Sequence, residues 1–173
     1  MEEFRVKLGN GKISVGDAML FTPTKNITIC EPTFEKAFVY VDYITKDYNE
    51  ACVRTLDDRH FQAINTDCLS YVDYRDVKLL ISEAKKYSSA NYYHDLQVVI
   101  DLQEDFDHLL GRFDEIKQDD IGALAYDIDC IIETLQYERC NDVQTSWTCK
   151  DLEFLKVLYN YCQLLGQWCQ KTN

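Results

Sequence analysis

Apolar and polar positions alternate through the first 72 residues, which is the pattern of β-strands. Between residues 4 and 8 apolar side chains alternate with basic ones, Gly9-Asn10-Gly11 follows, and Ile13 and Val15 resume the alternation. Alternation on both sides of a Gly-Asn-Gly turn predicts a hairpin.

Further apolar segments bounded by turn residues and by the two prolines predict strands at 18–21, 27–30, 37–45, 51–56 and 60–64. The last two are joined by Asp57-Asp58-Arg59 and form a second predicted hairpin. Five or six short strands at this spacing predict a small barrel or a strongly bent antiparallel sheet. The turn Val15-Gly16-Asp17 enters a strand, and a long strand and a hairpin follow it. This order resembles that of SH3-like small barrels over residues 12–72.

After Asp73 the apolar period changes from two residues to about 3.6, which predicts helices. Asp73 is placed to cap a helix over 74–87, and Ser88-Ser89 ends it. Two further helices are predicted at 91–117 and 120–136. Thr148-Cys149-Lys150-Asp151 resembles a capping box and opens a fourth predicted helix, which extends to about 170.

Each predicted helix has one apolar stripe. The inward positions are Val77, Leu80, Ile81 and Ala84, then Tyr92, Leu96, Val99, Phe106, Leu109, Leu110, Phe113 and Ile116, then Ile121, Leu124, Ile128, Ile131 and Leu135, and finally Leu155, Leu158, Cys162, Leu165 and Cys169. Such stripes predict a bundle of about four helices, with self-association as a homodimer as the alternative. We therefore expect an α+β protein with a small β domain at 1–72 and a helical bundle at 73–173.

Composition narrows the class of protein. The 173 residues are 46% hydrophobic, which is enough for a buried core. The start lacks the basic and apolar regions of a signal peptide, and no apolar run approaches the roughly 18 residues that span a bilayer, so we expect a soluble cytoplasmic protein without a membrane segment. The eight cysteines form no C-x-x-C pair and predict buried thiols, with a metal or redox role as the alternative.

Negative charge is concentrated in one stretch of the predicted bundle. Residues 95–133 hold 12 carboxylates against Arg112 and Lys117, a net charge of −10, whereas the whole chain has −12. An acidic block favours a basic partner, and direct nucleic-acid binding is excluded because it needs a basic surface.

At 100° per residue most of these carboxylates lie opposite the apolar stripes or on their flanks. Exposed tyrosines beside them are the kind of anchor that protein interfaces favour. The candidate partner-binding residues are Asp101, Glu104, Asp105, Asp107, Asp114, Glu115, Tyr126, Asp129, Glu133 and Tyr137. A merely solvated acidic face is the alternative, but like charges one turn apart destabilise a helix, and only two cations offset them.

Two antiparallel helices holding this stretch would carry one net charge per about 3 Å, within twofold of the charge density of duplex DNA. The pattern of residues 95–133 is similar to that of small acidic inhibitors from phages and mobile elements, including DNA mimics of the anti-restriction and anti-CRISPR kind. The resemblance implies a non-enzymatic inhibitor of a basic nucleic-acid-binding protein, such as a CRISPR or restriction nuclease. An immunity or antitoxin-like protein that neutralises a basic toxin is the alternative.

Enzyme motifs are incomplete. No segment has the spacing of an EF-hand, and the only pair typical of a dimetal bundle is Asp105-x-x-His108. His94-Asp95 resembles the metal-binding doublet of HD-type phosphohydrolases without its upstream histidine. Cys52, His60 and Cys68 come from neighbouring predicted strands and offer a nucleophile and a base. We expect no catalytic residue, metal or cofactor, and keep a metal-dependent hydrolase as the alternative from another class.

Overall fold

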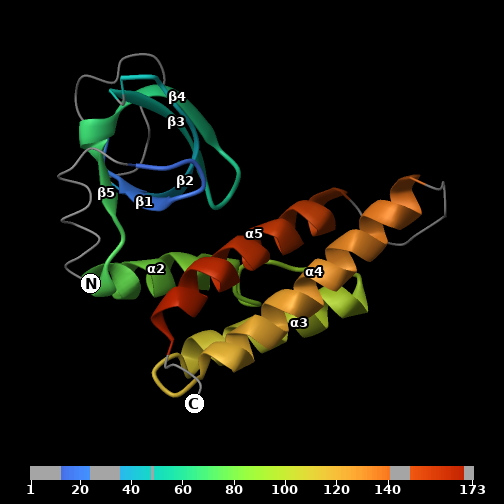
Figure 1. Ribbon diagram of the computed structural model, residues 1–173. Coiled ribbons are helices and arrows are strands. Elements are labelled where there is room, and N and C mark those ends of the chain that lie inside the picture. Colours follow the sequence, from blue (N-terminus) through green and yellow to red (C-terminus); the bar gives the residue numbers. More distant parts are fainter. Residues whose placement is uncertain (1–12, 24–35, 48, 141–148, 170–173) are drawn as a thin grey trace. The chain divides into compact units, whose positions relative to one another are not determined.

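The computed structural model describes residues 13–23, 36–47, 49–140 and 149–169. Its contacts divide the chain into two compact units, Met1–Asp76 and Val77–Asn173. The division falls four residues after the boundary that the change of period indicated. We call the first the β unit and the second the helical unit, and describe each by itself (Figure 1).

The β unit is a five-stranded antiparallel sheet with the order β4-β3-β2-β1-β5. Its strands are β1 (Ala18–Phe21), β2 (Ala37–Ile44), β3 (Glu50–Thr55), β4 (His60–Asn65) and β5 (Leu69–Tyr71). Of the two predicted alternatives, the structure has the bent sheet, because β4 and β5 form its two edges and the sheet does not close into a barrel. Strand β5 was not predicted. The predicted Gly9-Asn10-Gly11 turn and the strand at 27–30 lie outside the described residues.

The strand register shifts at two places in the sheet. One shift lies between Val41 and Tyr43 of β2, and another lies opposite β3 between Ala51 and Val53. At the second shift β4 has one extra residue, and Ala63 adopts φ 56°. Such bulges increase local twist and kink the strand, which lets a short sheet curve around its own core.

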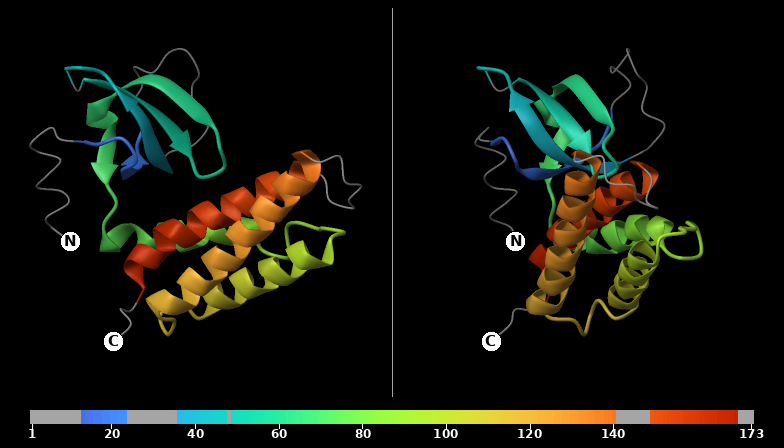
Figure 2. Two further views of the ribbon diagram at one scale, coloured as in Figure 1. Left: turned by 45° about the vertical axis from the view of Figure 1, so that its right-hand side comes forward. Right: turned by 90° about the vertical axis from the view of Figure 1, so that its right-hand side faces the viewer.

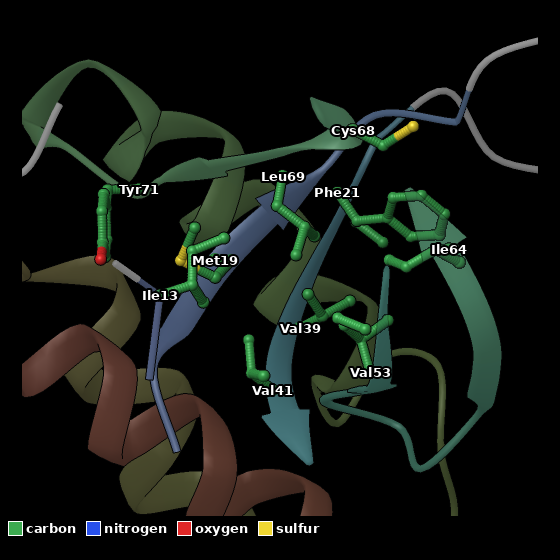
Figure 3. Packing of buried hydrophobic residues seen from close by; sticks show 12 residues of the cluster. Ile13, Met19, Phe21, Val39, Val41, Val53, Ile64, Cys68, Leu69 and Tyr71 are labelled. Atoms are coloured by element: carbon green, nitrogen blue, oxygen red, sulfur yellow. The ribbon is translucent and has the colours of Figure 1, made fainter. Parts of the chain in front are cut away.

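The core of the β unit lies on one face of the sheet, where strand alternation directs the side chains (Figure 3). Phe21 packs edge-on against Phe61, with ring centroids 5.7 Å apart. Figure 3 shows side chains from all five strands converging. The labelled members are Ile13, Met19, Phe21, Val39, Val41, Val53, Ile64, Cys68, Leu69 and Tyr71.

The helical unit contains α2 (Val77–Ala84), α3 (Gln97–Gly111), α4 (Gln118–Cys140) and α5 (Cys149–Leu165). The predicted cap is present in the turn before α2: the Arg75 N–H donates to Asp73 Oδ1 at 2.8 Å, and the Asp73 N–H donates to Asp76 Oδ2 at 2.9 Å. This reciprocal pair satisfies donors that a helix start leaves free.

The second helix is shorter than the predicted 91–117. It begins at Gln97, because the backbone before it is held by side chains from elsewhere in the unit. The buried Gln103 amide donates to the carbonyls of Tyr87 and Tyr92, at 3.0 and 3.4 Å. Tyr92 is 43% exposed and stacks on Tyr87. These tertiary contacts outweigh the local helical pattern.

The apolar stripes predict the core of the bundle correctly at most positions. α4 packs along α5, and α2 and α3 also contact α5 (Figures 1 and 2). Helices α3 and α4 run in opposite directions, joined by the turn at 112–117. Nearly fully buried side chains include Leu80, Phe106, Ile128, Leu155, Leu158 and Leu165. In the part of the chain that the structure describes, no helix combines the length and apolarity needed to cross a membrane.

Candidate protein-interaction face

The outer side of α3 is charged without being aromatic. Asp101, Glu104 and Asp105 are exposed, whereas Val99, Leu102, Phe106 and Leu110 are buried on the other side. Asp101 Oδ1 accepts a hydrogen bond from Gln97 Nε2 at 2.8 Å, one turn earlier. This helix therefore presents carboxylates outward, in the orientation that the helical period predicted.

Asp107 differs from the other predicted site residues on α3. It is half-buried, and its Oδ2 accepts from the Ser89 N–H at 3.0 Å and from Ser89 Oγ at 2.5 Å. Its Oδ1 is buried and accepts no hydrogen bond from any residue that the structure describes. Asp107 thus has a structural contact, because it fastens the non-helical segment before α3 to the helix.

The turn between α3 and α4 contains the only two cations of the 95–133 stretch. Arg112 Nε lies 3.3 Å from Glu115 Oε2, so one cation is paired inside the stretch. The Lys117 N–H donates to Asp120 Oδ2 at 2.9 Å and opens α4. Carboxylates in a first helical turn are stabilised by the helix dipole, which gives Asp119 and Asp120 a local role. Asp114 and Glu115 are exposed.

The outer side of α4 combines carboxylates with aromatic rings. Tyr126 and Tyr137 are 69% and 68% exposed, Glu133 is exposed, and Asp129 is half-buried. At 100° per residue, Tyr126, Glu133 and Tyr137 form one row directly opposite the buried stripe of the helix. The pKa of Tyr126 is raised by its hydrogen bond with Cys130, and the negative charges of Asp127 and Glu133 raise it further.

His94, one of the candidate metal ligands, is buried in the bundle. Its Nδ1 lies 3.0 Å from Oδ1 of the buried Asp151 on α5, and its ring centroid lies 4.2 Å from that of Phe154. Nε2 is buried and has no hydrogen-bond partner among the described residues. The contact joins the segment before α3 to the first turn of α5.

The other residues considered for enzyme chemistry include Asp105 and His108 on α3 and His60 in the β unit. Asp105 and His108 are both exposed on α3. His60 is exposed, and its ring nitrogens lie 3.2 Å from Asp58 Oδ1 and 3.8 Å from Asp42 Oδ2. Among the described residues, no group of three or more histidines, cysteines and carboxylates is arranged to hold a metal ion.

The six described cysteines are free thiols. Burial raises the pKa of Cys162 to about 12 and that of Cys169 to about 11. The charge of Cys169 adds to the first shift, and that of Asp120 adds to the second. Both thiols stay protonated at neutral pH, which fits a role in packing more than one as a nucleophile.

Sequence reasoning missed the contacts of Gln103 and Asp151. Each is a polar residue on the buried side of its helix, which is the sequence signal that was available. Their partners, the Tyr87 and Tyr92 carbonyls and His94, carry no periodic signal because they lie outside regular helix. Comparison of the chain with known proteins found no matching family, no matching curated protein and no matching solved structure.

Proposed function

We propose that this protein is a non-enzymatic inhibitor that binds another protein. Its acidic helical face, made of the ten candidate residues on α3, α4 and the turn between them, blocks the basic nucleic-acid-binding surface of a partner such as a CRISPR or restriction nuclease. The observation that carries the proposal is the outward placement of carboxylates in a stretch of net charge −10. One of its two cations is already paired within it.

The spacing of the charge supports a nucleic-acid-binding partner. Residues 118–133 of α4 extend about 24 Å, and the 15 residues of α3 extend about 22 Å beside them in the opposite direction. A net charge of −10 over that length is one charge per about 2.4 Å, against about 1.7 Å in duplex DNA. A channel lined with Lys and Arg to hold a duplex would attract such a surface over a similar length.

Repulsion among the carboxylates of residues 95–133 lowers helix stability, which favours a binding role for these charges. Like charges one turn apart destabilise a helix by a few tenths of a kcal/mol per pair. Capping accounts for Asp120, and a loop contact accounts for Asp107. Glu104, Asp105 and Glu133 are exposed on regular helix, where a mixture of carboxylates and cations would avoid the repulsion.

The test is a binding titration of purified CRISPR and restriction nucleases with two matched triple variants. The first changes Glu104, Asp105 and Glu133 to Lys, and the control changes Glu50, Asp67 and Glu153 to Lys. All six side chains are exposed, and both variants change the net charge equally. We expect the first variant to bind a target nuclease at least about tenfold more weakly at 0.15 M salt, and the control to lose much less.

Circular dichroism establishes that both variants keep their helices. Equal affinities for the two triple variants would contradict the proposal, because binding would then depend on overall charge and not on this face. A chain that binds a cationic toxin and none of the nucleases would assign the same face to an antitoxin-like function.

A further inference from the structure

The two acidic helices differ in one respect that bears on the chemistry of the partner. The exposed side chains of α3 are charged or polar, whereas the row on α4 also contains two tyrosines at 69% and 68% exposure. Both rings lie directly opposite the buried stripe of α4, so the packing of this stripe in the bundle core does not account for them.

Each of these tyrosines has a carboxylate one helical turn away. Asp129 follows Tyr126 by three residues, and Glu133 precedes Tyr137 by four. Side chains at these spacings are neighbours on a helix surface, with Cβ atoms about 5–6 Å apart. α4 therefore has two aromatic–carboxylate pairs, whose centres are about 11 Å apart along the helix.

A ring beside a carboxylate suits a guanidinium group better than an ammonium group. Arginine is planar, stacks on aromatic faces and forms paired hydrogen bonds to carboxylates, whereas lysine is a compact and strongly hydrated point charge. Stacking on tyrosine adds a cation–π attraction that is largest for a weakly hydrated, planar cation. The hydrogen bond with Cys130 is the main cause of the raised pKa of Tyr126, and the negative charges of Asp127 and Glu133 add to it. The same two charges favour a cation beside the ring.

We propose that the outer face of α4 selects arginine over lysine, and that the partner contacts it with a segment that presents arginines about 11 Å apart. The inference rests on the proposed function, since it names the chemistry of the basic partner. On this account α3 supplies attraction by charge alone, and α4 adds the discrimination between cations.

The probes are fluorescent hexa-arginine and hexa-lysine, which have equal charge, titrated against the full chain by anisotropy at about 20 mM salt. We expect hexa-arginine to bind about 5-fold to 30-fold more tightly, as two cation–π contacts at exposed sites would give. Changing Tyr126 and Tyr137 together to Leu should reduce this ratio to within about twofold and leave the affinity for hexa-lysine nearly unchanged. The control Tyr43→Leu removes a 58% exposed tyrosine of the β unit and should leave the ratio as it is.

Equal affinity for the two peptides would overturn the inference. In that case the variant with Lys at 104, 105 and 133 separates the two proposals. If it binds both peptides more weakly than the native chain does, the acidic face attracts cations by charge, and the proposed function stands without the selection of arginine. If neither peptide binds, the inference is overturned as well. The nuclease titration then decides the proposed function separately. Sedimentation of the chain alone gives the remaining outcome: a dimer that the double Leu variant dissociates would assign this face to a second copy of the chain.

Discussion

Charged side chains are arranged differently in the two units. In the β unit each described arginine lies beside a carboxylate: Arg54 lies 3.6 Å from Asp42, Arg59 3.1 Å from Asp57, and Arg75 3.1 Å from Asp73. In the helical unit two cations face 12 carboxylates between residues 95 and 133. The described arginines of the β unit are thus paired within the fold, whereas the 95–133 stretch of the helical unit holds ten more carboxylates than cations.

The largest effect is expected when the buried His94–Asp151 pair of the helical unit is broken. Unlike the exposed carboxylates of that unit, Asp151 is buried together with its partner. Asp151→Ala should lower the free energy of unfolding of that unit by about 2–4 kcal/mol, because it leaves a buried histidine nitrogen without its partner. Urea unfolding followed by tryptophan fluorescence measures it, since both tryptophans belong to the helical unit. A matched loss at the exposed Arg112–Glu115 pair, made by Glu115→Gln, should cost less than about 1 kcal/mol.

The next effect is the response of the two units to salt. Raising the salt concentration from about 0.02 to 0.5 M should stabilise the helical unit by roughly 1 kcal/mol, because several like-charge pairs of a few tenths of a kcal/mol each are screened. The β unit should change little or lose slightly, since its pairs are attractive. Hydrogen exchange resolves the two units in one experiment. An equal response of both units would remove the contrast between them.

A smaller effect is expected from removing one arginine in each unit. Arg54 is partly buried, pairs with Asp42 and lies over the Tyr40 ring at 5.6 Å, so Arg54→Met should destabilise the β unit by up to about 1 kcal/mol. Arg112 is more exposed, so Arg112→Met should cost a few tenths of a kcal/mol in stability. The same variant makes the acidic face one charge more negative and should strengthen partner binding. Weaker binding would argue that Arg112 is itself a contact.

The smallest effect concerns a single exposed carboxylate of the β unit. Hydrogen bonds from the Thr45 hydroxyl and from Asn49 hold the pKa of Asp47 below its ordinary value of 3.8. Because the folded pKa is lowered, the contribution to stability is present above the unfolded value and is lost as pH falls through the folded one. NMR titration should give Asp47 a midpoint below 3.8, and Thr45→Val should move it upward. An unchanged midpoint in that variant would mean that the hydroxyl has no part in the shift.

The sequence predicted what depends on local pattern and left out what depends on tertiary contact. The stripes of α4 and α5 and the hairpin at Asp57-Asp58-Arg59 follow from periodicity and turn chemistry, and the structure has them. The start of α3 does not follow, because Gln103 and Asp151 reach segments 11 to 57 residues away. Strand β5 was missed because three residues are too few to show an alternation.

The outward placement of the acidic face was also predictable, because charge and helical period together fix the exposed side. The sequence did not predict which of these carboxylates form hydrogen bonds within the helical unit. Asp107 holds Ser89, and Asp120 caps α4; the first contact spans 18 residues of sequence and the second depends on where the helix begins. Tyr126 and Tyr137 were recognised as exposed, but their regular spacing from carboxylates matters only once α4 is known to be continuous from Gln118 to Cys140.

The central claim is that the acidic face of the helical unit takes the place of nucleic acid on a basic partner. The most direct measurement is a competition titration, in which the chain is added to a target nuclease that holds a fluorescent DNA duplex. The account predicts stoichiometric release of the DNA by the native chain and by the Glu50, Asp67 and Glu153 to Lys control, and little release by the variant with Lys at 104, 105 and 133. Binding of the native chain to the nuclease without any release of DNA would contradict it.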